Sequence, residues 1–224
     1  AAPAFELVEG CDEEMAAFMA CGHAKLTDEV GVCVAPSGAP IAHLLSTLYD
    51  AEGDHQPLVA ILGQRREGED LEGTLELLPR MRNLAPDCVQ IVRDAAGLED
   101  AVDRAFNLAR SERLPSCILL SEDLLARTTG GTSSPRSPER APDRSATTIA
   151  LPPDEKLSLA ASELARGKRV AMIIGVGARQ AIDDALHVAD KLRAGVADAL
   201  LGVATLPDDL PYVTGGVGLL GTRA

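Results

Sequence analysis

The sequence predicts an α/β protein in which parallel sheets are flanked by helices. Short, almost continuous apolar runs alternate with segments of helical periodicity along both halves of the chain. Aromatic residues make up 2% of the 224 residues and hydrophobic residues 46%, so the core is expected to be aliphatic. Apolar runs of this kind are typical of strands buried on both faces, which is the arrangement in a parallel sheet covered by helices.

The first half of the chain alternates between the two patterns until Thr128. Buried strands are expected at residues 30–34, 58–62, 88–92 and 117–120, with a further candidate at 5–8. Helices are expected at residues 12–26, 41–49, around 75–84 and at 98–110. Residues 1–127 are therefore expected to form one domain.

A composition change marks the boundary of this domain. Residues 128–153 are dominated by Gly, Ser, Thr and Pro and have no apolar period, which predicts a linker. A second α/β pattern follows in residues 154–224. It comprises a helix at 154–166, a strand at 170–174, a helix at 178–193, a strand at 196–200 and a loop-rich tail at 207–221.

Charge and hydropathy exclude several classes of function. The net charge of −13 argues against nucleic-acid binding, because so acidic a surface repels phosphates. Every apolar run is too short to cross a bilayer, and the first residues lack the features of a signal peptide. The five cysteines form no CxxC pair and mostly sit in apolar segments, so buried free thiols and a cytoplasmic location are expected.

Two local motifs are candidates for chemistry, while catalytic-triad, metal-ligand and Walker patterns are absent from the sequence. The first is Asp12-Glu13-Glu14, which taken alone also fits a charged first helical turn stabilised by the helix dipole. The second is Gly175-x-Gly177 between a strand and a helix, where a bare backbone lets a phosphate approach. Position 180 is Gln, so the third glycine of a dinucleotide fingerprint is missing and a tight turn explains the pair equally well.

Several linked segments, taken in order, resemble the thiamine-diphosphate (ThDP) enzymes. In the first half they are CDEEMAAFMACGHAKLT at 11–27, GVCVAPSG at 31–38, HLLSTLYD at 43–50 and DHQPLVAILGQ at 54–64. In the second half they are VAMIIGVGAR at 170–179, AGVADALLG at 194–202, LPDDLP at 206–211 and GLLGT at 218–222. The branch most similar to the chain is pyruvate oxidase, also called quinone-dependent pyruvate dehydrogenase, and acetolactate synthase is its near relative.

The resemblance implies that residues 1–127 are a pyrimidine-binding domain with Glu13 as its key residue. The family glutamate at this position hydrogen-bonds N1′ of the cofactor's aminopyrimidine, which favours the imino tautomer that removes the thiazolium C2 proton. A carboxyl group in an apolar pocket can share its proton in this way. Ser37 and Gly38 are expected near the pyrimidine. His55 and Gln64 lie at strand ends, where cofactor contact and a packing role fit equally well.

The resemblance also implies that residues 154–224 are part of a Rossmann-like middle domain. Two segments match those that hold FAD in the oxidase and synthase branches: Gly175, Gly177 and Arg179, and then Val217, Gly218, Leu219 and Leu220. The alternative is a middle domain that has lost FAD. The family's Mg²⁺ and diphosphate motif belongs to a third domain that this sequence does not contain, so no metal ligands are expected here.

The chain departs from the family pattern in several places. The histidine before the key glutamate is Asp12, and the loop glycine of the family is replaced in Ala39-Pro40. The first strand-helix unit of the pyrimidine domain and the end of the middle domain are also missing, so a member truncated at both ends is expected.

The implied parent reaction is decarboxylation of a 2-oxo acid such as pyruvate, with electrons passing through FAD to a quinone. The chain alone is expected to be inactive. The alternatives are an acetolactate synthase-like carboligase, a non-catalytic binding subunit that needs a separate diphosphate-domain chain, and a decayed sequence. The family implies a cytoplasmic homo-oligomer, a homotetramer, with peripheral membrane contact only in the full-length parent.

Overall fold

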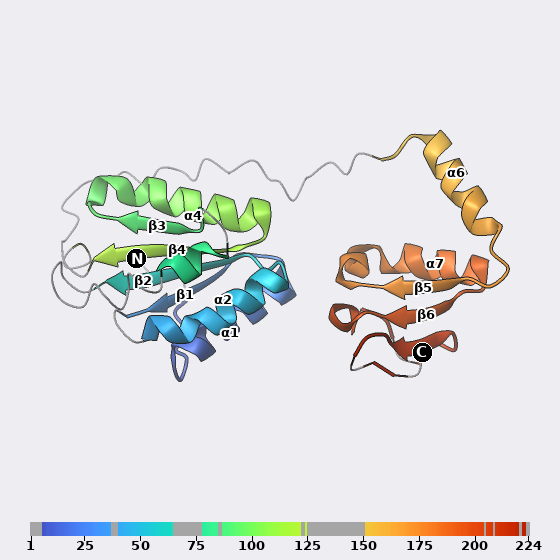
Figure 1. Cartoon of the computed structure of the whole chain (residues 1–224), viewed down its shortest axis with the longest axis horizontal. Coiled ribbons are helices and arrows are strands. Elements are labelled where there is room, and N and C mark those ends of the chain that lie inside the picture. Colours follow the sequence, from blue (N-terminus) through green and yellow to red (C-terminus); the bar gives the residue numbers. More distant parts are fainter. Residues whose placement is uncertain are drawn as a thin grey trace. The chain divides into compact units, whose positions relative to one another are not determined.

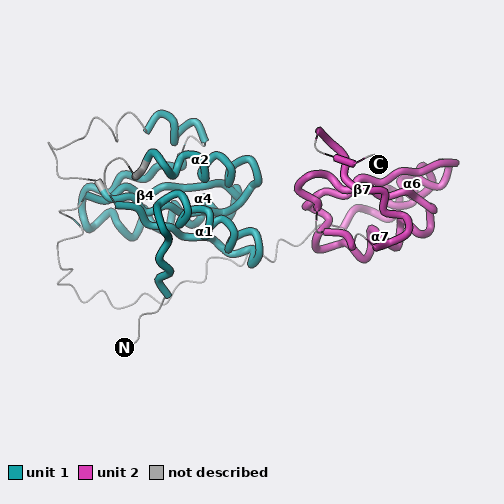
Figure 2. The backbone as a smooth tube through the Cα atoms, turned by 90° about the horizontal axis from the view of Figure 1, so that it is seen from below, with its two compact units in different colours: residues 1–144 teal, residues 145–224 magenta. Residues whose placement is uncertain are grey.

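The chain forms two compact units, residues 1–144 and 145–224 (Figure 2). The computed structural model describes residues 6–36, 40–64, 78–84, 87–121, 124, 151–203, 205–207, 209–219 and 221–222, with only the backbone of Pro40, Ile41 and Gln64. The division between the units falls inside residues 128–153, the stretch predicted as a linker.

The first unit is built on a four-stranded parallel sheet in the order β1-β2-β4-β3 (Figure 1). Its elements are α1 (Glu13–Thr27), β1 (Gly31–Ala35), α2 (Pro40–Gly53), β2 (Leu58–Gln64), β3 (Val89–Val92), α4 (Leu98–Glu112) and β4 (Pro115–Ser121). Residues 78–82 are helical as well, and a single 3₁₀ turn, η1 (Ala95–Gly97), leads into α4. This architecture confirms the predicted α/β class.

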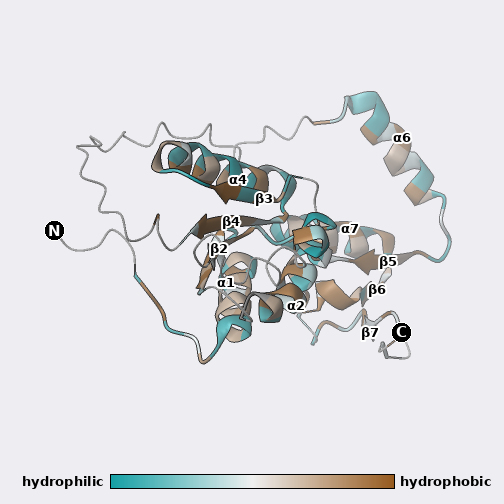
Figure 3. Cartoon of the chain, turned by 60° about the vertical axis from the view of Figure 1, so that its left-hand side comes forward, coloured by the Kyte–Doolittle hydropathy of each residue, from teal (hydrophilic) through white to brown (hydrophobic). Residues whose placement is uncertain are grey.

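Alternation along the strands supplies two apolar layers, one on each face of the sheet. Leu58, Ala60 and Leu62 of β2 pack with buried residues of α1 and α2. Val59 of the same strand packs with the alanines of α4 on the opposite face. Both faces are covered in this part of the sheet, so β2 and β4 read as continuous apolar runs. Figure 3 shows β4 coloured as hydrophobic and much of α4 as hydrophilic.

Helix α1 begins where a side chain caps it. The Asp12 carboxylate accepts a hydrogen bond from the backbone N–H of Met15 at 2.7 Å, which satisfies one of the free donors of the first turn. The buried face of α1 carries only small residues, Ala17, Ala20, Cys21 and Ala24. The helix therefore lies very close to β1, where Gly31 supplies a surface without a side chain.

The second unit contains a three-stranded parallel sheet in the order β5-β6-β7. Its elements are α6 (Asp154–Ala165), β5 (Ala171–Ile174), η3 (Val176–Ala181, a 3₁₀ helix), α7 (Ile182–Leu192), β6 (Gly195–Asp198), η4 (Leu200–Gly202, also 3₁₀) and β7 (Val213–Gly216). Apolar residues of β5, β6 and α7 form its core around Ile174, Ala189 and Val196.

The structure corrects several predicted boundaries. The helix expected at 178–193 begins as a 3₁₀ helix that runs to Ala181. The strand expected at 196–200 ends at Asp198, where the chain turns into η4. The loop-rich tail contains a strand, β7. Its two glycines have low strand propensity, so the sequence pattern did not predict it. Residues 6–8 of the strand candidate at 5–8 form no strand, and Phe5 lies outside the described residues.

The cysteines largely match the prediction of buried free thiols. None of the five forms a disulfide, and Cys21, Cys33, Cys88 and Cys117 are buried, whereas Cys11 is exposed. Burial raises the pKa of the Cys33 thiol to about 12. Among the helices that the structure describes, none combines the length and apolar character needed to cross a bilayer.

Candidate functional site

A cavity of about 750 Å³ lies beside the carboxyl end of β1 in the first unit. Helix α1 leads into β1 through a short turn, so the start of the helix lies next to the end of the strand. Glu13 and Pro36 consequently line the same cavity. Much of its wall is apolar, with Met19, Val32 and Val34 among its residues, and the segment 6–12 forms its other side.

Two neighbouring carboxylates of α1 have different surroundings. Glu14 accepts a hydrogen bond from the Ser46 hydroxyl, which ties α1 to α2. Glu13 is half-buried and lines the cavity, and within the described residues it has no hydrogen bond or ion pair. The Glu14 carboxylate thus links two helices, whereas the Glu13 carboxylate is available for a ligand.

The other predicted residues of the first unit have separate positions. Ser37 and Gly38 lie outside the described residues, although the preceding Pro36 lines the cavity. Gln64 ends β2 at the same carboxyl edge, but its side chain is outside the description. The structure does not bring His55 to this edge. His55 precedes β2 at the amino end, is exposed with φ 52°, and its carbonyl accepts from Arg113 Nε at 3.0 Å.

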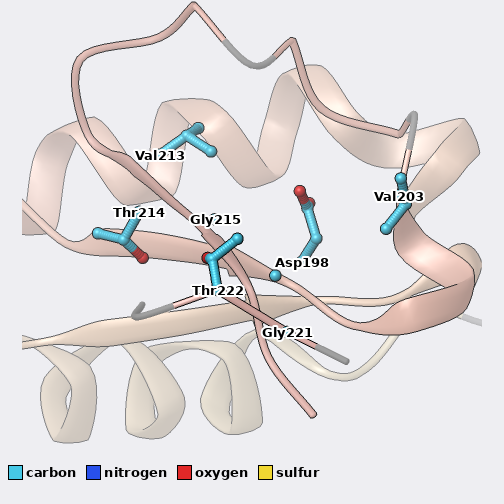
Figure 4. A pocket seen from close by; sticks show the side chains of 8 residues that line it. Asp198, Val203, Val213, Thr214, Gly215, Gly221 and Thr222 are labelled. Carbon is cyan, nitrogen blue, oxygen red and sulfur yellow. The ribbon is translucent and has the colours of Figure 1, made fainter. Parts of the chain in front are cut away.

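The second unit has a pocket of about 520 Å³ at the carboxyl ends of β6 and β7 (Figure 4). Its lining residues are Asp198, Val203, Val213, Thr214, Gly215, Gly216, Gly221 and Thr222. Figure 4 shows the Asp198 carboxylate between Val203 on one side and Val213 and Thr222 on the other. The Asp198 side chain belongs to a residue that is 4% exposed, and its Oδ1 has no hydrogen-bond donor in the described part of the chain.

Glycines shape the wall of this pocket. Gly215 has φ 112°, and a Cβ there would collide with the Thr222 side chain. A Cβ on Gly221 would lie 3.0 Å from the carbonyl carbon of Gly216 and closer still to its oxygen. A larger residue at either position would therefore force this segment to shift.

The predicted flavin residues are not among those that line this pocket, but two of them lie next to its residues or bond to one of them. Gly175 and Gly177 follow β5, and Ile174 is the register partner of Asp198. A Cβ added to either glycine would meet nothing within 4 Å, so open space faces both. Val217 donates its N–H to the Asp198 carbonyl at 2.7 Å. Arg179 is exposed in η3, Gly218 and Leu219 are exposed beyond β7, and Leu220 lies outside the described residues.

Asp198 is a candidate site residue that the sequence prediction missed. It stands 21 residues after Gly177 and ends the next strand of the sheet. An acidic residue about 20 residues beyond a glycine-rich turn is part of the dinucleotide-binding pattern. That spacing was the available signal, although it carried little weight without the third glycine.

Comparison with known proteins agrees with both units. Residues 1–82 match the family model "Thiamine pyrophosphate enzyme, N-terminal TPP binding domain", and residues 157–224 match "Thiamine pyrophosphate enzyme, central domain". The fold and these two matches therefore define an α/β protein with the domain order of these enzymes, the N-terminal domain before the central one. The chain belongs to the thiamine pyrophosphate enzyme family, thiamine pyrophosphate being another name for ThDP.

Individual relatives are similar over much of this chain. The Bacillus subtilis protein YdaP, named provisionally as thiamine pyrophosphate-containing, is 30% identical over 94% of the chain and 36% of its own length. The chloroplastic acetolactate synthase 1 of Nicotiana tabacum is 28% identical over 94% of the chain and 32% of its own length. Pyruvate oxidase of Lactiplantibacillus plantarum is 33% identical over 50% of the chain and 19% of its own length. The chain spans about a third of the length of the first two relatives.

Proposed function

We propose that this chain is part of a ThDP-dependent enzyme that decarboxylates a 2-oxo acid such as pyruvate, with Glu13 as the carboxyl group that hydrogen-bonds N1′ of the aminopyrimidine. The observation that carries the proposal is the contrast between the two glutamates of α1. Glu14 is engaged by Ser46, whereas Glu13 lines an apolar-walled cavity without a partner among the described residues.

The surroundings of Glu13 suit an aminopyrimidine. Met19, Val32 and Val34 offer an apolar wall for a flat ring, and the carboxyl group stands beside it as its hydrogen-bonding partner. When bound, ThDP supplies a thiazolium carbon that adds to the carbonyl group of the substrate. Glu13 would hold and share the proton at N1′.

The second unit supports the flavin part of the proposal, which the oxidase and synthase branches share. The pocket at β6 and β7, together with Gly175 and Gly177 at the end of β5, has the backbone exposure and size expected of a nucleotide site, so FAD is proposed as its ligand. FAD would pass electrons from the decarboxylated substrate to a quinone. The match to acetolactate synthase favours the second candidate, in which the same site serves a carboligase.

The proposal places the rest of the catalytic apparatus outside this chain. Residues that hold Mg²⁺ and the diphosphate would come from another domain, carried by a full-length parent enzyme that we propose to be a cytoplasmic homo-oligomer, a homotetramer, or by a separate chain. This chain alone is therefore expected to show no turnover when pyruvate, ThDP, Mg²⁺ and an electron acceptor are added.

Exchange of the ThDP C2 proton tests the role of Glu13 without requiring turnover. Proton NMR in D₂O follows the loss of this signal with the chain at millimolar cofactor. We expect the wild type to accelerate exchange and Glu13→Gln to lose about 100-fold or more of that acceleration, because general acid–base catalysis contributes at least this much. Glu14→Gln is the matched control and should keep it. Equal exchange rates in the wild type and Glu13→Gln would refute the assignment.

A further inference from the structure

We propose that Asp198 is the ribose-recognition residue of the second unit, accepting a hydrogen bond from a hydroxyl group of the ligand's ribose. The proposal deepens the assignment of a flavin nucleotide to this unit and rests on it. It names a residue outside the two predicted flavin segments, and it names the part of the ligand that this residue recognises.

The first observation is the state of the carboxyl group. Two buried side-chain oxygens in the described part of the chain lack a donor, Gln56 Oε1 and Asp198 Oδ1, and only the second belongs to a carboxyl group. Burying a carboxylate oxygen without a donor is costly, so native proteins rarely keep one without a reason. Here the group also lines a pocket, where a ligand hydroxyl could supply the missing donor.

The second observation is the position of Asp198 in the sheet. It is the last residue of β6 and the register partner of Ile174, the residue before Gly175. The backbone N–H of Ala199 donates to the Ile174 carbonyl at 2.8 Å, so the ends of the two strands are held together. In dinucleotide-binding βαβ units an acidic residue at this place takes the ribose, while the glycine turn faces the phosphates. Gly175-x-Gly177, α7 and Asp198 reproduce that order.

The surroundings favour a neutral hydroxyl over a cation or a phosphate. The described residues contain no cluster of three or more His, Cys, Asp or Glu side chains that could hold a metal ion. Asp198 is the sole ionisable residue among those lining the pocket, and its negative charge would repel a phosphate. Thr214, the hydroxyl residue of β7, already donates to the Val196 carbonyl at 3.0 Å, so its proton is used elsewhere.

Titration calorimetry with FAD, FMN and ADP tests the proposal on the full chain. We expect Asp198→Ala to weaken FAD and ADP by about 10- to 100-fold, the range for a hydrogen bond to a charged group. FMN carries a ribityl chain in place of ribose, so its affinity should be unchanged by the substitution. The control is Asp190→Asn, which also removes one negative charge but at an exposed position on α7, and it should bind like the wild type.

The outcomes separate this proposal from the assignment of FAD. If the wild type binds ADP but not FAD, and Asp198→Ala still weakens ADP, the assignment of FAD is wrong but the ribose contact is supported. Three results would overturn the ribose contact. The first is that Asp198→Ala and the control bind ADP and FAD equally well, and the second is that Asp198→Ala loses affinity for FMN alone. The third is that the wild type binds neither ADP nor FAD.

Thermal melting without ligand distinguishes a ligand-binding role of Asp198 from a structural one, because the two roles predict opposite changes in the melting temperature. Asp198→Asn keeps the size of the side chain and removes the buried charge, so the ligand-free protein should melt at or above the wild-type temperature. A lower melting temperature would show that Oδ1 has a structural partner and would contradict the proposal.

Discussion

Replacing Gly31 by alanine would test how closely α1 rests on the sheet. A Cβ at this position would lie 2.7 Å from the carbonyl carbon of Ala20 and closer still to its oxygen. Ordinary contact begins at 3.4 Å, so relieving the contact with the carbon alone requires a shift of about 0.7 Å, and the contact with the oxygen requires a larger one. The obstacle is helix backbone, which cannot rotate away as a side chain can. We therefore expect a loss of about 3 kcal/mol in the free energy of unfolding, the upper end of the range for overpacking.

Replacing Gly22 of α1 by alanine provides a control with the opposite expected effect on stability. A Cβ there would meet nothing within 4 Å, so the substitution adds no clash. Alanine in a helix interior is better than glycine by about 0.5–1 kcal/mol, because glycine loses more backbone entropy on folding. Gly22→Ala should therefore raise the free energy of unfolding of the first unit.

Hydrogen exchange measured by mass spectrometry is the suitable assay, because peptides from β1 and β2 report the opening of the first unit alone. The second unit supplies an internal reference whose exchange should not change. The reasoning would be refuted if β1 and β2 kept wild-type protection in Gly31→Ala while Gly22→Ala gained the expected protection. Such a result would mean that α1 does not lie directly on β1.

Three further predictions concern titrating groups. Cys11 should be the one thiol that reacts rapidly with a disulfide reagent at pH 8, and Cys11→Ser should abolish that fast phase, because the other cysteines are buried. The raised pKa of Cys33 stabilises the fold below pH 9 and loses this contribution as pH rises toward 12, so urea unfolding should show declining stability across that range. The hydrogen bond to Asp54 raises the pKa of Lys25 above 10.5, so its contribution is present below that pH and lost above it. Lys25→Met should therefore cost at most about 1 kcal/mol at pH 7, the pair being partly exposed, and match the wild type in strongly alkaline urea titrations.

Much of the first unit could be predicted because its strands and helix starts leave a recognisable pattern in short stretches of sequence. The runs that became β2 and β4 are apolar throughout, since helices cover both faces of the sheet there. Asp12 also stands where the helix starts, and an aspartate is a favourable N-cap, although the sequence prediction placed it inside the first turn.

The remaining features depend on neighbours that are distant in sequence. The strand β7 is held by pairing with β6, because Thr-Gly-Gly has little strand propensity of its own. The difference between Glu13 and Glu14 depends on Ser46, which lies about thirty residues away. The isolation of Asp198 Oδ1 is likewise a property of its three-dimensional surroundings, so the residue type alone could not reveal it.

The strand order of the first unit has a consequence for its synthesis on the ribosome. Strand β4 lies between β2 and β3, yet it follows both in the sequence. β3 ends at Val92 and β4 begins at Pro115, so the ribosome needs about 1–5 s to supply the missing strand at typical rates. During that interval, among the strands that the structure describes, β3 has no partner and β2 keeps one unpaired edge, the kind of edge on which nascent chains pair wrongly with one another. Whether a newly made molecule folds or aggregates would thus be decided within the translation of α4 and β4.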